Sequence, residues 1–188
     1  ASGRVFVSFT NLSGDSVVAR FTRSTVNPLR ADPGTRFDLV WYGQPFIEQP
    51  FGNHNGGNIA FGPDGDLYVC DNQNWPTGNG DHGEINDGRI LRLHVTGGAI
   101  VGTTVVAQGI SHPNGIRVRD GKLYVTVSLL PKVEREDGLL TSAVYVFPAD
   151  GREITVTNTL EDPQLLVALV TQNRHCQYGA DGLVFDRH

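Results

Sequence analysis

The sequence has no methionine and only two cysteines, Cys70 and Cys176, among its 188 residues. Two cysteines are too few for a disulfide framework, so we predict buried or free thiols rather than a bridge. The first residues, Ala-Ser-Gly, are not a signal peptide. We therefore assign no compartment and expect a processed product or a shortened chain.

Long apolar runs and an excess of positive charge are also absent. No run reaches the roughly 18 apolar residues of a membrane-spanning helix, which predicts that no membrane is a partner. The formal net charge of −5 provides no basic surface for phosphates, so we predict no nucleic-acid partner. With 39% hydrophobic and 19% charged residues, the composition is that of a folded, core-forming chain.

No stretch has the 3.6-residue period of a long helix, whereas glycine is abundant. Glycine accounts for 23 of the 188 residues, nearly twice its usual share of about 7%. Many tight turns and short alternating segments together predict an all-β fold.

A repeat organises the chain. The segment Gly3-Arg-Val-Phe-Val-Ser returns as Gly65–Cys70 and as Gly121–Thr126. The copies divide a single domain, 1–188, into the repeat units 3–64, 65–120 and 121–188, each predicted to hold four short strands. The predicted second strands are Val17–Phe21, Ile90–Val95 (with His94 as an exposed strand residue) and Ala143–Phe147; the third are Phe37–Tyr42, Thr104–Ala107 and Leu165–Val170; the fourth begin at Gly57, Asn114 and Asp181.

Four-stranded units at this spacing are typical of the blades of a β-propeller. Propellers close with four to eight blades, so three blades leave a ring incomplete. We therefore predict half of a six-bladed propeller built from antiparallel blades. Either a second copy of the chain or the remainder of a longer polypeptide would complete it.

The predicted topology gathers polar residues at one mouth of the channel. In a four-stranded antiparallel blade, the loop leading into the innermost strand and the loop joining the second and third strands lie at the same end. Such convergent polar groups predict a site for a small-molecule substrate. The residues are His54, Asn55, Asn58, His112, Asn114, His175, Gln177 and Asp181, together with the loop 71–87.

The side chains at this mouth suggest metal chemistry. Asn and Asp oxygens are hard ligands that suit Ca²⁺, with Mg²⁺, Mn²⁺ or Zn²⁺ as alternatives. A cation held there can polarise a lactone or ester carbonyl and hold water for attack. Asp181 is a candidate general base or nucleophile, and His112 and His175 are candidate proton carriers. His54 is a further candidate catalytic residue, with a structural role as a loop cap as the alternative. Asn114-Gly and Asp181-Gly are also ordinary turn formers, so a purely structural role at the start of a strand stays open.

Two family resemblances bear on function. His112-Pro-Asn-Gly-Ile116, Asp120–Val125 and Gly179–Asp186 resemble the gluconolactonase, senescence-marker-protein-30 and luciferin-regenerating family of six-bladed propellers. The resemblance implies a metal-dependent hydrolase of lactones or related esters, with one divalent cation on the propeller axis. It implies Asn114 and Asp181 as ligands. The family's Glu ligand is either missing or lies in the other half of the propeller. The first corner carries Gly57, with Asn55 and Asn58 on either side of it as candidates for a third ligand.

The second resemblance is local. His54-Asn-Gly-Gly57 and the residues that follow are similar to the His-x-Gly-Gly stretch of quinone-dependent soluble sugar dehydrogenases. This implies an alternative oxidoreductase function in which His54 is the base. A propeller that binds a partner without catalysis is the third hypothesis.

Overall fold

The computed structural model describes residues 3–13, 15–40, 43–46, 58–71, 88–97, 99–171, 180 and 182–186. Within these ranges there is no helix, and the strands form three sheets. The predicted all-β fold is therefore confirmed. The described residues therefore include no helix long and apolar enough to cross a membrane.

The first sheet has three antiparallel strands in the order β1-β2-β3. They are β1 (Arg4–Thr10), β2 (Ser16–Arg23) and β3 (Ala31–Asp38). Arg4 of β1 lies opposite Thr22 of β2, and the register continues without a shift to Thr10 opposite Ser16.

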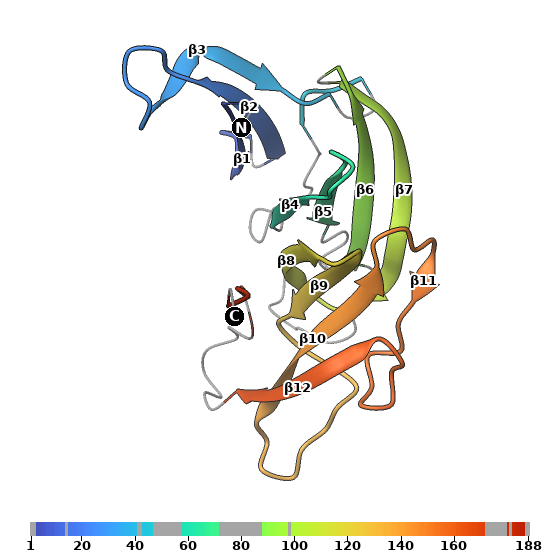
Figure 1. Cartoon of the computed structure of the whole chain (residues 1–188). Helices are drawn as coiled ribbons and strands as arrows, with labels where there is room; N and C mark the ends of the chain where they lie inside the picture. The colour runs from blue at the N-terminus through green and yellow to red at the C-terminus, as the bar shows by residue number, and fades with distance from the viewer. Residues whose placement is uncertain are drawn as a thin grey trace.

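The second sheet runs in the order β4-β5-β6-β7, with the short strand β11 on its outer edge (Figure 1). Its strands are β4 (Ile59–Phe61), β5 (Leu67–Asp71), β6 (Gly88–Thr96), β7 (Ala99–Ile110) and β11 (Ile154–Thr155). All pairs are antiparallel except that of β11 with β7.

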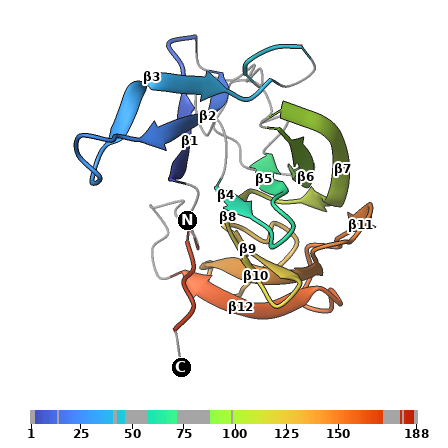
Figure 2. The same ribbon diagram turned by 45° about the horizontal axis from the view of Figure 1, so that its top comes forward.

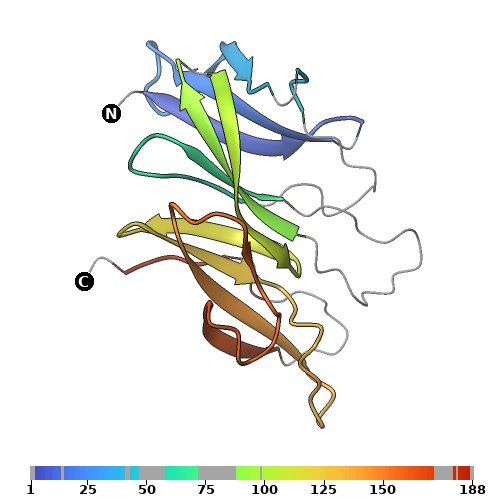
Figure 3. The same ribbon diagram turned by 90° about the vertical axis from the view of Figure 1, so that its right-hand side faces the viewer.

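The third sheet repeats the four-stranded order as β8-β9-β10-β12, with all pairs antiparallel. Its strands are β8 (Pro113–Arg119), β9 (Lys122–Val127), β10 (Leu140–Pro148) and β12 (Leu165–Thr171). Seen from the side, the three sheets follow one another with the second in the middle (Figure 3).

Two predicted strands differ from the structure. Residues 182–186, expected within the fourth strand of the last unit, are assigned to no strand. Phe37–Tyr42 was expected as the third strand of the first unit, but β3 runs from Ala31 to Asp38. The turn-forming residues 32–34 concealed the strand, because they form a local bulge within it. The N–H of Gly34 donates to Asp32 Oδ1 at 2.9 Å, and the pairing with β2 shifts register nearby.

The glycine that opens each repeat has a conformational reason. Gly3, Gly65 and Gly121 have φ of 65°, 87° and 71°. This left-handed region is strained for residues with a Cβ and open to glycine. The repeated sequence pattern therefore corresponds to a repeated turn, placed each time just before the same strand of a sheet.

The second sheet is buried on both faces. Along β5, Leu67 and Val69 pack in a cluster with Val18 of the first sheet. Their neighbours Tyr68 and Cys70 point the other way, into a larger cluster shared with the third sheet. Cys70 is a free, buried thiol as predicted, and burial raises its pKa; Cys176 lies outside the described residues.

A polar cluster fixes the turn between β4 and β5. Asp66 Oδ2 accepts a hydrogen bond from Arg92 Nε and contacts His94 Nδ1, both at 2.7 Å. Asp66 Oδ1 accepts the Val95 N–H at 3.2 Å. Burial raises the pKa of Asp66, but these hydrogen bonds outweigh it and the pKa lies below its usual value. His94, expected to be exposed, is thus half-buried and bonded.

Replacing Asp66 by Asn should lower the free energy of unfolding by about 1–3 kcal/mol, because the neutral amide cannot accept the same charge-assisted bonds. The pKa of Asp66 is lower in the folded state than in the unfolded chain. The stabilisation by the ionised carboxylate is therefore fully present above the unfolded pKa of about 3.9, and it is lost as the pH falls through the pKa of the folded state. Urea unfolding at about pH 7 and about pH 3 measures both effects.

Asp150→Asn is the matched control, because the Asp150 side chain is exposed. It should unfold like the parent protein at both pH values. A loss of stability that is the same for Asp66→Asn at both pH values would contradict the proposed role of the carboxylate.

Candidate functional site

Two of the predicted ligand residues lie at adjacent strand starts. Asn58 directly precedes β4, and Asn114 is the second residue of β8. The backbone N–H of Asn58 donates to the carbonyl oxygen of Asn114 at 2.9 Å. The second and third sheets therefore meet at this point, and β4 and β8 lie side by side (Figure 2).

A bulge shapes the start of β8 around Asn114. The register with β9 shifts between Pro113 and Ile116. The Gly115 N–H donates to the buried hydroxyl of Thr126 at 2.6 Å in place of a regular ladder bond. Asn114 Nδ2 lies 3.4 Å from Ser128 Oγ, to which it donates. Bulges of this kind redirect a side chain at a sheet edge and are common beside functional sites.

His112 lies next to the same bulge. It is half-buried, and its φ of 49° places it in the left-handed region that few non-glycine residues adopt. Its Nδ1 is 2.9 Å from Ser111 Oγ, and its carbonyl oxygen accepts the Ser128 N–H at 3.2 Å. These bonds hold the His112 backbone and ring beside Asn114.

The beginning of β6 packs tightly against the end of β7 and the beginning of β8. A Cβ on Gly88 would lie 2.5 Å from both the Ile110 carbonyl oxygen and Pro113 Cδ. Only glycine allows that approach. The end of β5 and the beginning of β6, on either side of the segment 72–87, are thus held beside the beginning of β8.

Several predicted site residues cannot be placed. His54, Asn55, His175 and Asp181 lie outside the residues that the structure describes, as do Gly57 and Gln177. Of the predicted set, the structure therefore describes Asn58, His112 and Asn114, and it brings the three to one end of the two adjoining sheets.

A buried ion pair lies at the same end of the second sheet. Arg89 Nη2 donates to Asp71 Oδ2 at 2.7 Å, and the Asp71 side chain is only 1% exposed. Burial raises the pKa of Asp71, while the hydrogen bond and charge of Arg89 lower it; the pKa lies above its usual value. In the described part of the chain, Asp71 Oδ1 and Arg89 Nε have no hydrogen-bond partner.

From the sequence, Asp71 was expected only as the first residue of a polar loop. Strand alternation puts its side chain with Leu67 and Val69, on the face toward the first sheet. A signal was present in the repeat itself. The other two copies have Phe9 and Val127 at this position, so a carboxylate at the end of an apolar strand departs from the pattern.

The described residues contain no group of three or more His, Cys, Asp or Glu side chains that could hold a metal ion. The donors at the start of β4 and β8 are instead amides. Amide oxygens are hard ligands that Ca²⁺ accepts alongside carboxylates and water. The donor chemistry of Asn58 and Asn114 therefore fits Ca²⁺ better than Zn²⁺, which prefers nitrogen and sulfur.

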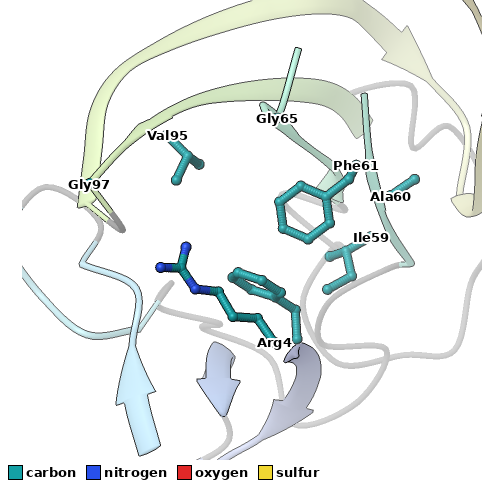
Figure 4. A pocket seen from close by; sticks show the side chains of 8 residues that line it. Arg4, Ile59, Ala60, Phe61, Gly65, Val95 and Gly97 are labelled. Atoms are coloured by element: carbon teal, nitrogen blue, oxygen red, sulfur yellow. The ribbon is translucent and has the colours of Figure 1, made fainter. Parts of the chain in front are cut away.

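A separate pocket opens at the opposite end of β4 and β5. It has a volume of about 520 Å³ and lies between the first and second sheets (Figure 4). The Arg4 side chain and the rings of Phe6 and Phe61 line it, together with Gly65 and Gly97. It includes none of the predicted site residues.

No model of a known protein family and no curated protein matches this chain.

Replacing Arg89 by Leu should cost about 3 kcal/mol of unfolding free energy, because the buried Asp71 carboxylate loses the counter-charge that Arg89 provides. The double variant Asp71→Leu/Arg89→Leu should be more stable than Arg89→Leu alone, since it removes the unpaired charge as well. Urea unfolding of the parent, both single variants and the double variant gives the coupling energy. A double variant less stable than Arg89→Leu would contradict the pairing.

Proposed function

We propose that the chain forms three blades of a six-bladed β-propeller. Three observations support the proposal: the sheets succeed one another (Figure 3), the four-stranded order occurs twice, and the same turn glycine opens each repeat. In this interpretation β4 and β8 are innermost strands, and the segment 182–186 is the innermost strand of a further blade.

We further propose that the protein is a metal-dependent hydrolase of lactones or related esters. The observation that carries this proposal is the backbone hydrogen bond between Asn58 and Asn114, because it brings two predicted ligand positions together at the starts of β4 and β8. Residues at successive innermost strands face a common channel in a propeller, where a small molecule can be enclosed.

The residues proposed to hold the cation are Asn114, Asn58 and Asp181, with Asn55 as a further donor. Two amides and one carboxylate leave a bound Ca²⁺ with residual positive charge. A cation bound there would polarise the carbonyl of the substrate and position a water molecule for attack.

His112 is proposed to move the proton. During hydrolysis the water oxygen bonds to the carbonyl carbon, the ester C–O bond breaks, and one proton must pass from the water to the departing oxygen. An imidazole exchanges protons readily near neutral pH. The Ser111 hydroxyl at Nδ1 and the Ser128 bond to the backbone orient His112 for this task. Asp181 is the alternative base.

Replacing Asn114 by Ala should weaken Ca²⁺ binding by at least about tenfold and reduce lactone hydrolysis by a similar factor. Asn27→Ala is the matched control, since Asn27 lies in an exposed turn where its Oδ1 accepts the Leu29 N–H. Titration calorimetry with Ca²⁺ and a lactone hydrolysis assay measure the two effects. Hydrolysis that persists unchanged in excess chelator would contradict a metal-dependent reaction.

A further inference from the structure

Strand β1 has one edge without a partner. Within the described residues it pairs only with β2, whereas the corresponding strands β5 and β9 are each covered by an additional strand. The pattern Gly-x-Val/Leu-Phe/Tyr-Val identifies the three strands as equivalent. Among the residues that the structure describes, the first sheet therefore has no counterpart of β4 and β8. An open edge of this kind is a template for pairing with another strand.

The segment 182–186 has the sequence of such a strand but belongs to no sheet in the structure. Gly182-Leu-Val-Phe185 parallels Asn58-Ile-Ala-Phe61 and Gly115-Ile-Arg-Val118. Its contact with the preceding sheet is also the expected one. The Phe185 ring lies edge-on against Tyr124 with centroids 4.7 Å apart, as Phe61 lies against Phe6 at 4.5 Å.

Apolar side chains are exposed on the outer faces of both end sheets. Val5 and Val7 of β1 are 44% and 41% exposed, although the equivalent residues of β5 and β9 are buried. On the third sheet, Val167 and Leu169 of β12 are 41% and 42% exposed. They lie opposite Val144 and Ser142, on the face turned away from the second sheet.

We infer that these two faces and the open edge are covered by a second copy of this chain. The segment 182–186 of each copy pairs antiparallel with β1 of the other, and the outer face of the third sheet packs on the first sheet of the partner. Each copy gives its segment 182–186 to β1 of the other, so the two copies are related by a two-fold axis. Both open edges are then paired, and the six sheets close into a ring. This inference rests on the half-propeller in the proposed function.

The complete sheets fix the register of this pairing. Phe61 lies opposite Leu67, and Val118 lies opposite Leu123. By equivalence, Phe185 of one copy lies opposite Val5 of the other. Extending the register by one residue places Asp186 opposite Arg4.

This register matches opposite charges across the interface. At the corresponding position of the third sheet, Arg119 lies opposite Lys122, two like charges. In the inferred pairing, the Asp186 carboxylate meets the Arg4 guanidinium. Among the described residues, Arg4 is exposed and forms no ion pair. Charge complementarity thus selects the segment 182–186 for this edge.

Size-exclusion chromatography with light scattering tests the inference on the full chain. The expected mass is twice 20.4 kDa. Arg4→Asp and Asp186→Arg should each shift the equilibrium toward monomer, and the two together should restore the dimer. Arg152→Asp, a reversal at another exposed arginine, should leave the mass unchanged. A parent protein of 20.4 kDa, or single reversals that leave the dimer intact, would overturn the inference.

A cross-link tests the register without depending on the charge variants. Leu183 is inferred to lie opposite Val7 of the partner, as Ile59 lies opposite Val69. Val7→Cys/Leu183→Cys should form a covalent dimer on mild oxidation, whereas Val101→Cys/Leu183→Cys should not. A bond formed only within one chain, or no bond, would contradict the pairing.

The outcome separates this inference from the proposed function. A dimer that binds no Ca²⁺ would refute the proposed metal site but would agree with the inferred dimer interface. A monomer that binds Ca²⁺ and hydrolyses lactones would refute the interface alone.

Discussion

Burial of the second sheet on both faces is the constraint on which the rest of the structure depends. Alternate residues of β5 enter two separate apolar clusters, one with the first sheet and one with the third. Neither face can be exposed to water without losing about 1.5–3 kcal/mol for each large side chain. The neighbouring sheets are therefore fixed against it, and this packing brings the start of β8 within a backbone hydrogen bond of Asn58.

Much of the strand pattern could be predicted from the sequence because its signals are local. The glycines of the repeat need positive φ, and the apolar residues after each of them alternate as a strand between two packed faces requires. The proximity of Asn58 and Asn114 also followed from the repeat, since each lies at the start of the fourth strand of its unit, one aligned position apart. His112 was found for the same reason, through the Pro-Asn-Gly turn that follows it.

The rest depends on contacts between residues distant in sequence. Nothing local indicates that Asp66 will accept bonds from Arg92 and His94, or that Arg89 will neutralise Asp71 across the sheet. β3 was misplaced because its bulge carries turn-forming residues inside a strand. The roles of His54, Asn55, His175 and Asp181 stay predictions, because those residues lie outside the described part of the chain.

The proposed function depends on a single cation bound between the polar starts of β4 and β8. A long-wavelength anomalous map from crystals grown with Ca²⁺ is the sharpest test of that proposal. We expect one peak about 2.3–2.6 Å from side-chain oxygens of both Asn58 and Asn114. A peak bound elsewhere, or none at saturating Ca²⁺, would contradict it.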